Sequence, residues 1–416
     1  MIKQKKRLLY VVGGRRAAPR VDVAVLFGEH LGRNLFNIDW VVFDPKPSIS
    51  WRKEDWNGAT AYWIGRPSKQ GLRSAIQIKL IELGADLRTF GIALRGDYEL
   101  IQVRDKFVSA LLCLIAAKLR GRLYTYWLSY PFPESRVLDA KEGRARIPAL
   151  SWLAGKLSGW LLYKIIMPNA NHIFVQSEQM RRDIAENGIP LNKMTSVPMG
   201  VDERLLDSPK QDIEPDTVLY LGTLVRVRRL EVLLEAMAEV IKTRPHARII
   251  FVGEGDSPQD RTFLENRAHQ LGIENSVEFT GQMPMREALE RVARAAICVS
   301  PFYPTFVLRS TSPTKLIEYM AQGKPIVAND HPEQQEILKS SGAGLCVPWS
   351  VETFSDAILS LLNDPDAAAE MGAKGPAWVA ENRTYKRIAD QIYSKYSEIF
   401  SIQANAEHPH TEQKRS

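Results

Sequence analysis

The sequence has little cysteine and no long apolar run, and both shortages narrow the class of protein. Only three cysteines occur among 416 residues, Cys113, Cys298 and Cys346. They lie in apolar segments without the spacing of metal ligands, so we expect reduced core residues of a cytosolic protein, without disulfides. No apolar run reaches the roughly 18 residues that a transmembrane helix needs. The longest run, 107–117, is expected to be a buried helix, and the run 8–12 is too short for a signal peptide.

Acidic residues are scarce in the N-terminal half. Residues 1–197 contain 31 Lys and Arg against 17 Asp and Glu, a net charge of +14, whereas the remainder contains 24 against 31, a net charge of −7. A basic half indicates an anionic partner such as a lipid phosphate or a membrane surface; a solvated basic surface without a partner is the alternative. Nucleic acid is not expected, because the basic residues are dispersed and no known nucleic-acid-binding module is visible.

The chain is long enough for two domains of about 200 residues each. In the C-terminal half, apolar segments typical of buried strands alternate with helical patterns, at 218–222, 248–253, 277–280, 297–300, 325–328 and 345–347. The N-terminal half alternates less regularly, with strands expected at 8–12, 39–43, 99–103, 123–126 and 173–176, and helices at 21–32, 70–87, 106–119 and 147–167. This alternation predicts α/β domains, each a doubly wound parallel sheet with helices on both faces.

Composition also suggests where the domains end. We expect an N-terminal domain over 1–200, a polar, proline-containing linker over 201–216 and a second domain over 217–384. A helix follows over 385–402. Apolar periodicity stops after it, which predicts a disordered tail over 403–416.

Glycine-rich turns follow three of the predicted strands, at Gly13-Gly14, Gly222-Thr223 and 253–255. In open parallel sheets, ligands bind beyond the carboxyl ends of the strands. One such turn is a weak signal, because any tight connection can use a glycine. Their joint placement favours a ligand site at these strand ends.

The segment 312–330 reads as a helix, a tight turn and a strand. Ser312 is expected to cap the helix and Pro313 to occupy its first position. A helix N-terminus that opens after a loop offers free N–H groups and a partial positive charge, so it can hold a diphosphate. Glu318 lies deeper in the helix and can accept hydrogen bonds from sugar hydroxyls. An ordinary amphipathic helix with an exposed Glu318 is the alternative.

Four runs carry a resemblance to a known family: VPMGVD at 197–202, YLGTLVRVR at 220–228, FVGEG at 251–255 and SPTKLIEYMAQG at 312–323. In order and spacing they resemble glycosyltransferase family 4, most clearly over 170–380. The resemblance implies the GT-B fold, in which two Rossmann-like domains face each other across a cleft. It implies that the C-terminal domain binds a nucleotide sugar and the N-terminal domain binds the acceptor. It also implies a retaining reaction without a bound metal or other cofactor, and a C-terminal helix that packs back on the first domain.

The resemblance assigns roles to residues of the second domain. Glu318 matches the second glutamate of the family's Glu-x7-Glu motif, which usually holds ribose hydroxyls, and Arg228 stands where a lysine usually binds the diphosphate. A guanidinium can do so through a bidentate fork, although Arg226 and Arg229 are close enough to be alternatives. Lys315, a cation on a first helical turn, opposes the helix dipole, so a phosphate role competes with a plain structural one. The expected donor-binding residues are Gly222, Thr223, Arg228, Gly253, Ser310, Thr311, Ser312, Thr314, Lys315 and Glu318.

Three departures from the family pattern leave the chemistry open. Ser310 replaces the first glutamate of the motif and Thr223 replaces an arginine. The histidine often found after the fourth strand is absent from 126–134. These changes leave undetermined which groups hold the hexose and which one deprotonates the acceptor.

Candidates on the acceptor side come from the first domain. Asp105 and Glu134 are the catalytic candidates, although Asp105 is more readily explained as the cap of a helix beginning at Lys106. Trp127, with Tyr130 and Phe132, either stacks on a sugar ring or belongs to the core. Gly14 and Arg15 follow the first strand and could let an acceptor approach it closely.

Residues 144–167 are apolar, with tryptophans, lysines and arginines spread through them. This composition resembles an interfacial helix of a peripheral membrane enzyme, and a surface that packs against other helices is the alternative.

The sequence therefore predicts a retaining glycosyltransferase on the cytoplasmic face of the inner membrane. It would move a hexose-type sugar from a UDP- or GDP-sugar to a lipid-linked or oligosaccharide acceptor in surface or exported polysaccharide synthesis. A nucleotide-sugar epimerase of the same architecture, or a non-catalytic partner protein with a degenerate donor site, are the alternatives.

Overall fold

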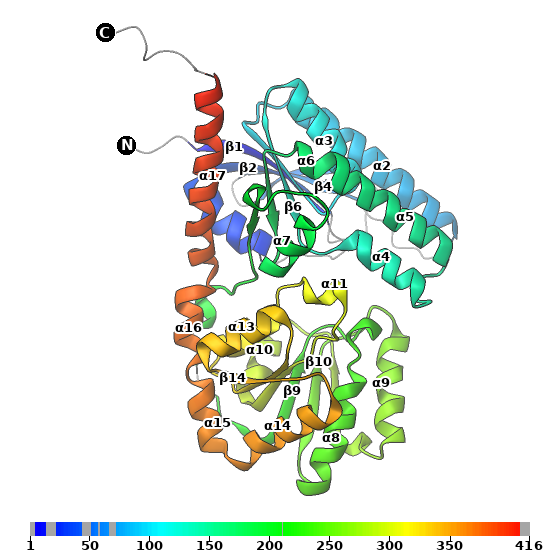
Figure 1. Ribbon diagram of the computed structural model, residues 1–416, viewed down its shortest axis with the longest axis vertical. Helices are drawn as coiled ribbons and strands as arrows, with labels where there is room; N and C mark the ends of the chain where they lie inside the picture. The colour runs from blue at the N-terminus through cyan, green and yellow to red at the C-terminus, as the bar shows by residue number, and fades with distance from the viewer. Residues whose placement is uncertain are drawn as a thin grey trace. The chain divides into compact units, whose positions relative to one another are not determined.

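The computed structural model describes residues 5–13, 22–43, 51–56, 59–65, 72–209 and 211–407 (Figure 1). The chain divides into two compact units, residues 1–198 with 388–416, and residues 199–387. Each contains a largely parallel sheet with helices on both faces, as the alternation of strands and helices predicts.

The sheet of the first unit has the strand order β3-β4-β2-β1-β5-β6-β7-β8, in which all pairs are parallel except β3 with β4. Its strands are β1 (Lys6–Val12), β2 (Phe36–Phe43), β3 (Arg52–Trp56), β4 (Ala59–Ile64), β5 (Leu100–Arg104), β6 (Leu123–Leu128), β7 (His172–Val175) and β8 (Met194–Ser196). Its helices are the π-helix η1 (Asp22–Leu31), α1 (Gly32–Asn34), α2 (Leu72–Arg95), α3 (Phe107–Leu119), α4 (Phe132–Lys141), α5 (Pro148–Leu161), the π-helix η2 (Leu162–Ile166), α6 (Met167–Asn169), α7 (Glu178–Ala185) and the 3₁₀ turn η3 (Leu191–Lys193).

The sheet of the second unit is parallel throughout, with the order β11-β10-β9-β12-β13-β14. Its strands are β9 (Glu214–Leu221), β10 (Arg248–Val252), β11 (Val277–Gly281), β12 (Ala295–Ser300), β13 (Ile326–Asn329) and β14 (Gly344–Val347). The helices are η4 (Glu203–Leu205), η5 (Arg226–Arg228), α8 (Glu231–Thr243), α9 (Pro258–Gln270), η6 (Glu274–Ser276), α10 (Met285–Arg294), α11 (Phe306–Arg309), α12 (Thr314–Ala321), α13 (Pro332–Ser341), α14 (Val351–Asn363), α15 (Pro365–Gly372) and α16 (Gly375–Asn382).

Alternate residues of β9 show how the second sheet is covered on both faces. Val218 and Tyr220 belong to one apolar cluster, which includes Leu233 of α8. Leu219 belongs to the cluster on the other face, which includes Met320 of α12. A strand buried on both faces reads as a continuous apolar run, and this is why the sequence predicts these strands well.

Helix α17 (Tyr385–Glu407) contributes residues 388–407 to the first unit. Tyr396 is fully buried, donates its hydroxyl to Gln102 Oε1 and packs its ring edge-on against Phe36, with centroids 5.0 Å apart. The resemblance implies this packing. The helix continues through Glu407, so residues 403–407 are helical rather than part of a disordered tail; residues 408–416 lie outside the described part of the chain.

Some boundaries differ from the predicted ones. Residues 201–216, expected to be a linker, belong to the second unit: Val201 forms a bridge with Thr384, and β9 already begins at Glu214. Helix α2 continues to Arg95, beyond the predicted end at 87. Among the described residues, no helix is both long enough and apolar enough to cross a membrane.

Candidate donor-binding site

The strand order of the second unit reverses between β9 and β12. In doubly wound sheets, the crevice beyond the carboxyl ends of the strands at such a reversal is where ligands bind. Gly222 follows β9, and its N–H donates to Val252 O at 2.9 Å. Gly253 follows β10 with φ of +138°, and a Cβ built there would lie 2.1 Å from Gly222 O. The two turns therefore touch backbone to backbone, which a side chain at position 253 would prevent.

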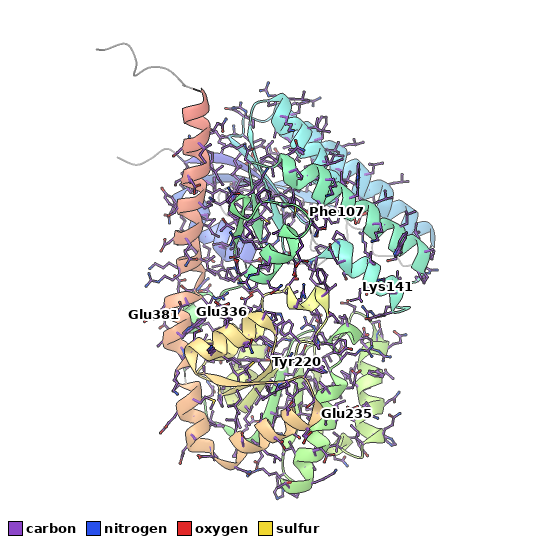
Figure 2. All side chains as sticks on the ribbon, viewed as in Figure 1. Phe107, Lys141, Tyr220, Glu235, Glu336 and Glu381 are labelled. Carbon is purple, nitrogen blue, oxygen red and sulfur yellow. The ribbon has the colours of Figure 1, made fainter. Side chains whose placement is uncertain are left out.

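Lys315 is buried beside these turns, on the first turn of α12. Its Nζ donates to the hydroxyl of Tyr220 at 3.1 Å and lies 4.2 Å from the centroid of that ring, which Figure 2 labels. Among the described residues, no carboxylate lies within ion-pair distance of this nitrogen. Burial, and next the Arg228 guanidinium, hold the pKa of Lys315 well below its ordinary value, while Glu318 acts in the opposite direction. A buried ammonium without a counter-ion is costly, and an incoming anion would relieve this cost.

Three neighbouring arginines have different environments. Arg226 stacks on Phe263, with its guanidinium carbon 3.4 Å from the ring centroid. Arg229 lies 3.7 Å from the Glu231 carboxylate. Arg228 instead donates from Nε to Thr223 Oγ1 at 3.1 Å. Since it also acts on the pKa of Lys315, the structure places Arg228, rather than the two alternatives, with the buried lysine.

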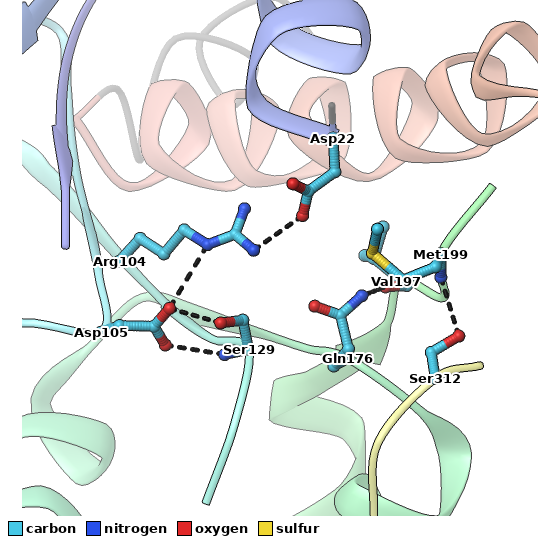
Figure 3. A network of polar contacts seen from close by, with 8 residues as sticks. All are labelled: Asp22, Arg104, Asp105, Ser129, Gln176, Val197, Met199 and Ser312. Carbon is cyan, nitrogen blue, oxygen red and sulfur yellow. Dashed lines mark hydrogen bonds and ion pairs between the residues drawn. The ribbon is translucent and has the colours of Figure 1, made fainter. Parts of the chain in front are cut away.

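The predicted cap of α12 is wrong. The helix begins at Thr314, its N-cap position is Pro313, and no side chain caps it. Ser312 Oγ instead accepts the Met199 N–H at 2.9 Å, as Figure 3 shows, and donates to Glu333 Oε1 at 2.8 Å. The Ser312 hydroxyl therefore belongs to this buried network, in which its oxygen accepts from the Met199 N–H and its proton goes to Glu333, instead of capping the helix.

The residues just before α12 are also committed to local contacts. Ser310 is buried and donates to Phe306 O at 3.2 Å, and Thr311 Oγ1 donates to Leu308 O at 2.7 Å. Two backbone amides at the start of α12 are engaged as well, since Thr311 N–H donates to Leu308 O and Thr314 N–H to Ser312 O, both at 3.1 Å. The cationic groups of this site are therefore the side chains of Arg228 and Lys315, whereas these two backbone N–H groups already have partners within the chain.

Glu318 follows Lys315 by three residues and shares its face of α12. Its side chain is half-buried rather than fully exposed. Burial raises its pKa to about 7, against the lowering effect of Lys315. Around neutral pH, this carboxyl group therefore changes between a hydrogen-bond donor and a pure acceptor.

Aromatic residues of the site were not predicted from the sequence. Tyr220 carries the contact with Lys315, and the hydroxyl of Tyr319 accepts the Leu221 N–H at 2.7 Å, which fixes α12 to the end of β9. Phe302, beyond β12, has its ring centroid 5.3 Å from Lys315 Nζ. Apolar runs contain all three, so nothing in the pattern separates them from ordinary core residues.

In the first unit, the residues at the ends of β5 and β6 form a buried ionic network (Figure 3). Arg104 is fully buried and donates to Asp22 Oδ2 at 2.7 Å and to Asp105 Oδ2 at 3.4 Å. Asp105 has φ of +58° and accepts from both the N–H and the hydroxyl of Ser129. The predicted helix cap is wrong, since α3 begins at Phe107 without a side-chain cap. Both oxygens of Asp105 hold neighbouring loops together.

Glu134 lies on the first turn of α4. Its Oε1 accepts the hydroxyl of Tyr163 at 2.8 Å, and its buried Oε2 has no partner among the described residues. Burial raises the pKa of Glu134, and the hydrogen bond from Tyr163 acts against this. Glu134 therefore keeps one carboxylate oxygen whose hydrogen-bonding capacity no described residue fills.

Trp127 is a core residue. It is fully buried on β6 between Phe27 and Phe174, with ring centroids 5.5 Å and 5.4 Å away. Of the two predicted possibilities, stacking on a sugar ring or packing in the core, the structure shows core packing for Trp127. Gly14 and Arg15 lie outside the described residues. Among the described residues, no group of His, Cys, Asp and Glu has the arrangement of a metal site.

Comparison with known proteins identifies the domain that holds the Lys315 site. Residues 202–378 match the model of the family described as glycosyl transferases group 1. These residues therefore form a domain of that family, as the four sequence runs indicate.

Curated relatives match over part of their length. The GDP-mannose-dependent alpha-(1-6)-phosphatidylinositol monomannoside mannosyltransferase of Mycobacterium tuberculosis is 28% identical over 182 residues, which cover 43% of this chain and 46% of the relative. The D-inositol 3-phosphate glycosyltransferase of Segniliparus rotundus is 28% identical over 220 residues, covering 49% of this chain and 46% of the relative. The chain spans about half the length of these curated relatives.

Solved structures match over nearly the whole chain. Sucrose-phosphate synthase from Thermosynechococcus elongatus has a TM-score of 0.70 at 20% identity, covering 95% of this chain and 100% of the other. Anabaena Alr3699/HepE in complex with UDP has a TM-score of 0.67 at 15% identity, covering 94% and 100%. These likenesses concern the fold alone, and they confirm the predicted α/β fold class with two parallel-sheet domains, that of GT-B glycosyltransferases.

Proposed function

We propose that this chain is a retaining family 4 glycosyltransferase. It moves a hexose-type sugar from a UDP- or GDP-sugar to a lipid-linked saccharide in surface or exported polysaccharide synthesis. One observation carries the proposal: the buried Lys315 ammonium, without a carboxylate partner among the described residues, lies beside Arg228 at the strand reversal of a glycosyl transferases group 1 domain.

Transfer from a nucleotide sugar releases a nucleoside diphosphate, so negative charge grows on the leaving oxygen as the glycosidic bond breaks. Arg228 and Lys315 would neutralise this charge in a site that excludes water, where fixed charges act strongly. Glu318 would hold the ribose hydroxyls. With two cations in place, we expect no need for a divalent metal or another cofactor.

One mycobacterial relative supports a lipid-borne acceptor, and the comparisons leave the donor base undecided. The mycobacterial relative is named for GDP-mannose and a phosphatidylinositol mannoside, whereas HepE was solved with UDP. We therefore keep both bases in the proposal. We also propose that the protein is cytoplasmic and associates peripherally with the membrane, because a lipid-borne acceptor stays at the bilayer. The contact would be made by the basic first unit and residues 144–167.

For the acceptor side we favour Glu134 over Asp105 as the base. Asp105 has both oxygens engaged, whereas Glu134 keeps Oε2 free of partners among the described residues. Oε2 is the atom that would accept the proton of the attacking hydroxyl.

The proposal is tested by thermal-shift titration of the purified protein with UDP, GDP, ADP and their sugar conjugates, with and without EDTA. A rise in melting temperature with one uridine or guanosine series, unchanged by EDTA, supports the donor site and identifies the base. Sugar release or transfer in the presence of a lipid extract then separates an enzyme from a non-catalytic nucleotide-binding protein. No shift with any nucleotide would refute the donor site.

A further inference from the structure

The most unusual surface of the molecule is helix α5, which buries small residues and exposes large apolar ones. Gly155 and Ser158 are buried, and a Cβ built on Gly155 would lie 2.8 Å from Pro133 O of α4. Small residues thus make the contact with the protein. Five large apolar residues of α5 are more than two-fifths exposed, namely Leu150, Trp152, Leu153, Leu157 and Trp160.

Helical spacing places four of these residues on one stripe. Leu150, Leu153, Leu157 and Trp160 follow one another at intervals of three or four residues, so helical geometry places their side chains along one side of α5. Exposed fractions of 59%, 48%, 58% and 59% show that nothing in the described chain covers this stripe. A contiguous exposed apolar patch of this kind marks an interaction site.

The charges carried by the α5 segment itself are of one sign. No Asp or Glu occurs between Glu142 and Glu178. Arg146 before α5, Lys156 within it and Lys164 beyond it are all exposed. Arg144, by contrast, is engaged with Asp139 and Glu142, so it does not contribute to the free positive charge.

We propose that α5 is a membrane-docking helix that lies flat on an anionic bilayer, with its apolar stripe inserted among the lipids. A helix whose exposed residues are apolar, with tryptophans among them, and whose own charged residues are all cationic matches the boundary between acyl chains and anionic headgroups. A second copy of the chain fits this surface poorly, because the same cations would face each other across the contact. The small residues pack closely against α4 while the apolar stripe is already exposed, so docking needs no rearrangement of the helix.

This inference deepens the proposed function by naming the surface through which the protein would reach a lipid-borne acceptor. It stands on α5 alone and is tested without nucleotide or acceptor. A failure of membrane docking and a failure of glycosyl transfer are therefore distinguishable.

The test is co-sedimentation of the full chain with vesicles of phosphatidylcholine alone or mixed with phosphatidylglycerol. We expect binding to the anionic vesicles that weakens with added salt. The double variant Leu157→Ser, Trp160→Ser should lose about tenfold or more in affinity, because it removes two inserted side chains. The matched control Ile213→Ser, Met285→Ser changes two equally exposed apolar residues elsewhere, 52% and 51% exposed, and should bind like the wild type.

Two further measurements keep the proposal open to refutation. Lys156→Gln, Lys164→Gln should weaken binding to anionic vesicles about fivefold per charge and flatten the salt dependence. Brominated lipids should quench the fluorescence of the wild type more than that of Trp152→Phe, Trp160→Phe, which preserves the apolar surface. The inference would be overturned by equal binding to both vesicle types or by an equal loss of binding in the control variant. It would also be overturned if the protein bound no vesicles and sedimented as a dimer that dissociates when Leu157 is changed.

Discussion

Lys315 Nζ lies 3.1 Å from the hydroxyl oxygen of Tyr220 and 4.2 Å from the centroid of the same ring. The hydroxyl of Tyr220 is itself a donor to Thr223 O at 3.1 Å, so it can offer Lys315 only a lone pair. The ammonium is thus held by an aromatic ring and a neutral oxygen, both weaker partners than a carboxylate. This arrangement leaves Lys315 available to an incoming anion.

The first prediction concerns protons. Because burial holds the pKa of Lys315 well below its ordinary value, a diphosphate beside it should raise that pKa. At any pH where the free protein holds part of Lys315 as the neutral amine, binding should therefore cause proton uptake. Calorimetry in buffers of different ionisation enthalpy measures this uptake directly. Lys315→Met should lose about tenfold or more in nucleotide affinity together with the proton uptake. Unchanged affinity in this variant would contradict a phosphate role for Lys315.

The second prediction separates the three arginines. Arg228→Ala should weaken binding of UDP or GDP by about ten- to a hundredfold, the range for a hydrogen bond to a charged group. Arg226→Ala is the matched control, since its guanidinium stacks on Phe263 and should leave nucleotide affinity nearly unchanged. Arg228→Lys should show intermediate affinity, because it keeps the charge but loses the fork. Titration calorimetry measures all three, and a larger loss for Arg226→Ala would reverse the assignment.

The third prediction concerns pH. Glu318, with its pKa raised to about 7, is mostly ionised above this value and mostly protonated below it. A carboxylate accepts hydrogen bonds from both ribose hydroxyls, so the contribution of Glu318 to nucleotide affinity should rise as pH increases from 6 to 8, a window set by that pKa. This contribution is opposite in sign to that of Lys315, whose proton uptake favours binding at lower pH. Stability should change in the opposite direction, because a folded-state pKa above the unfolded one favours folding only while the group is protonated.

Glu318→Gln tests both parts. It should bind nucleotide more weakly at high pH, and its affinity and its free energy of unfolding should vary less across this window. Glu318→Ala should lose nucleotide binding while the fold is kept, which circular dichroism verifies. A wild-type pH dependence retained in Glu318→Gln would assign the titration to another group.

The strands and helices of the second unit were predictable because the pattern that indicates each of them lies within a few consecutive residues. Runs such as 218–221 are apolar on consecutive residues, which indicates strands buried on both faces, and each run is followed by a glycine or a helical pattern. The first sheet was harder to predict at its edge. Strand β3 reads Arg-Lys-Glu-Asp-Trp, and a charged edge strand has the composition of a loop.

Site details depended on contacts between distant residues. The sequence shows that Ser312 precedes a helix, but not that Glu333, which follows helix α12 and strand β13, accepts its hydroxyl. It shows a lysine at position 315, but not that Tyr220 shields it. For α5, composition indicated an interfacial helix. Only the packing of Gly155 against α4 shows which side faces outward.

The fourth prediction concerns the contact between the two glycine turns. Gly253→Ala should lower the free energy of unfolding by about 2 kcal/mol or more, because the new Cβ would lie 2.1 Å from Gly222 O. The matched control is Gly272→Ala, which also has a positive φ, +71°, but no atom within 4 Å of the added Cβ. It should lose only about 1 kcal/mol. Chemical denaturation measures both, and equal losses would show that backbone strain alone accounts for the effect.

The fifth prediction distinguishes the two acceptor-side carboxylates. Glu134→Gln keeps the shape of the side chain and an oxygen for the Tyr163 hydroxyl but removes the base, so the transfer rate should fall about a hundredfold with little change in stability. Asp105→Asn should instead lower the free energy of unfolding by about 2 kcal/mol, because an amide nitrogen cannot accept from Ser129.

Tyr163→Phe provides the sharper control for Glu134. The Tyr163 hydrogen bond lowers the pKa of Glu134, so its removal should raise that pKa and move the rising limb of the rate against pH to higher pH. The plateau rate should be retained, since Oε2 is untouched. Glu134 would be excluded as the base if the transfer rate of Tyr163→Phe rose at the same pH as that of the wild type and Glu134→Gln stayed active.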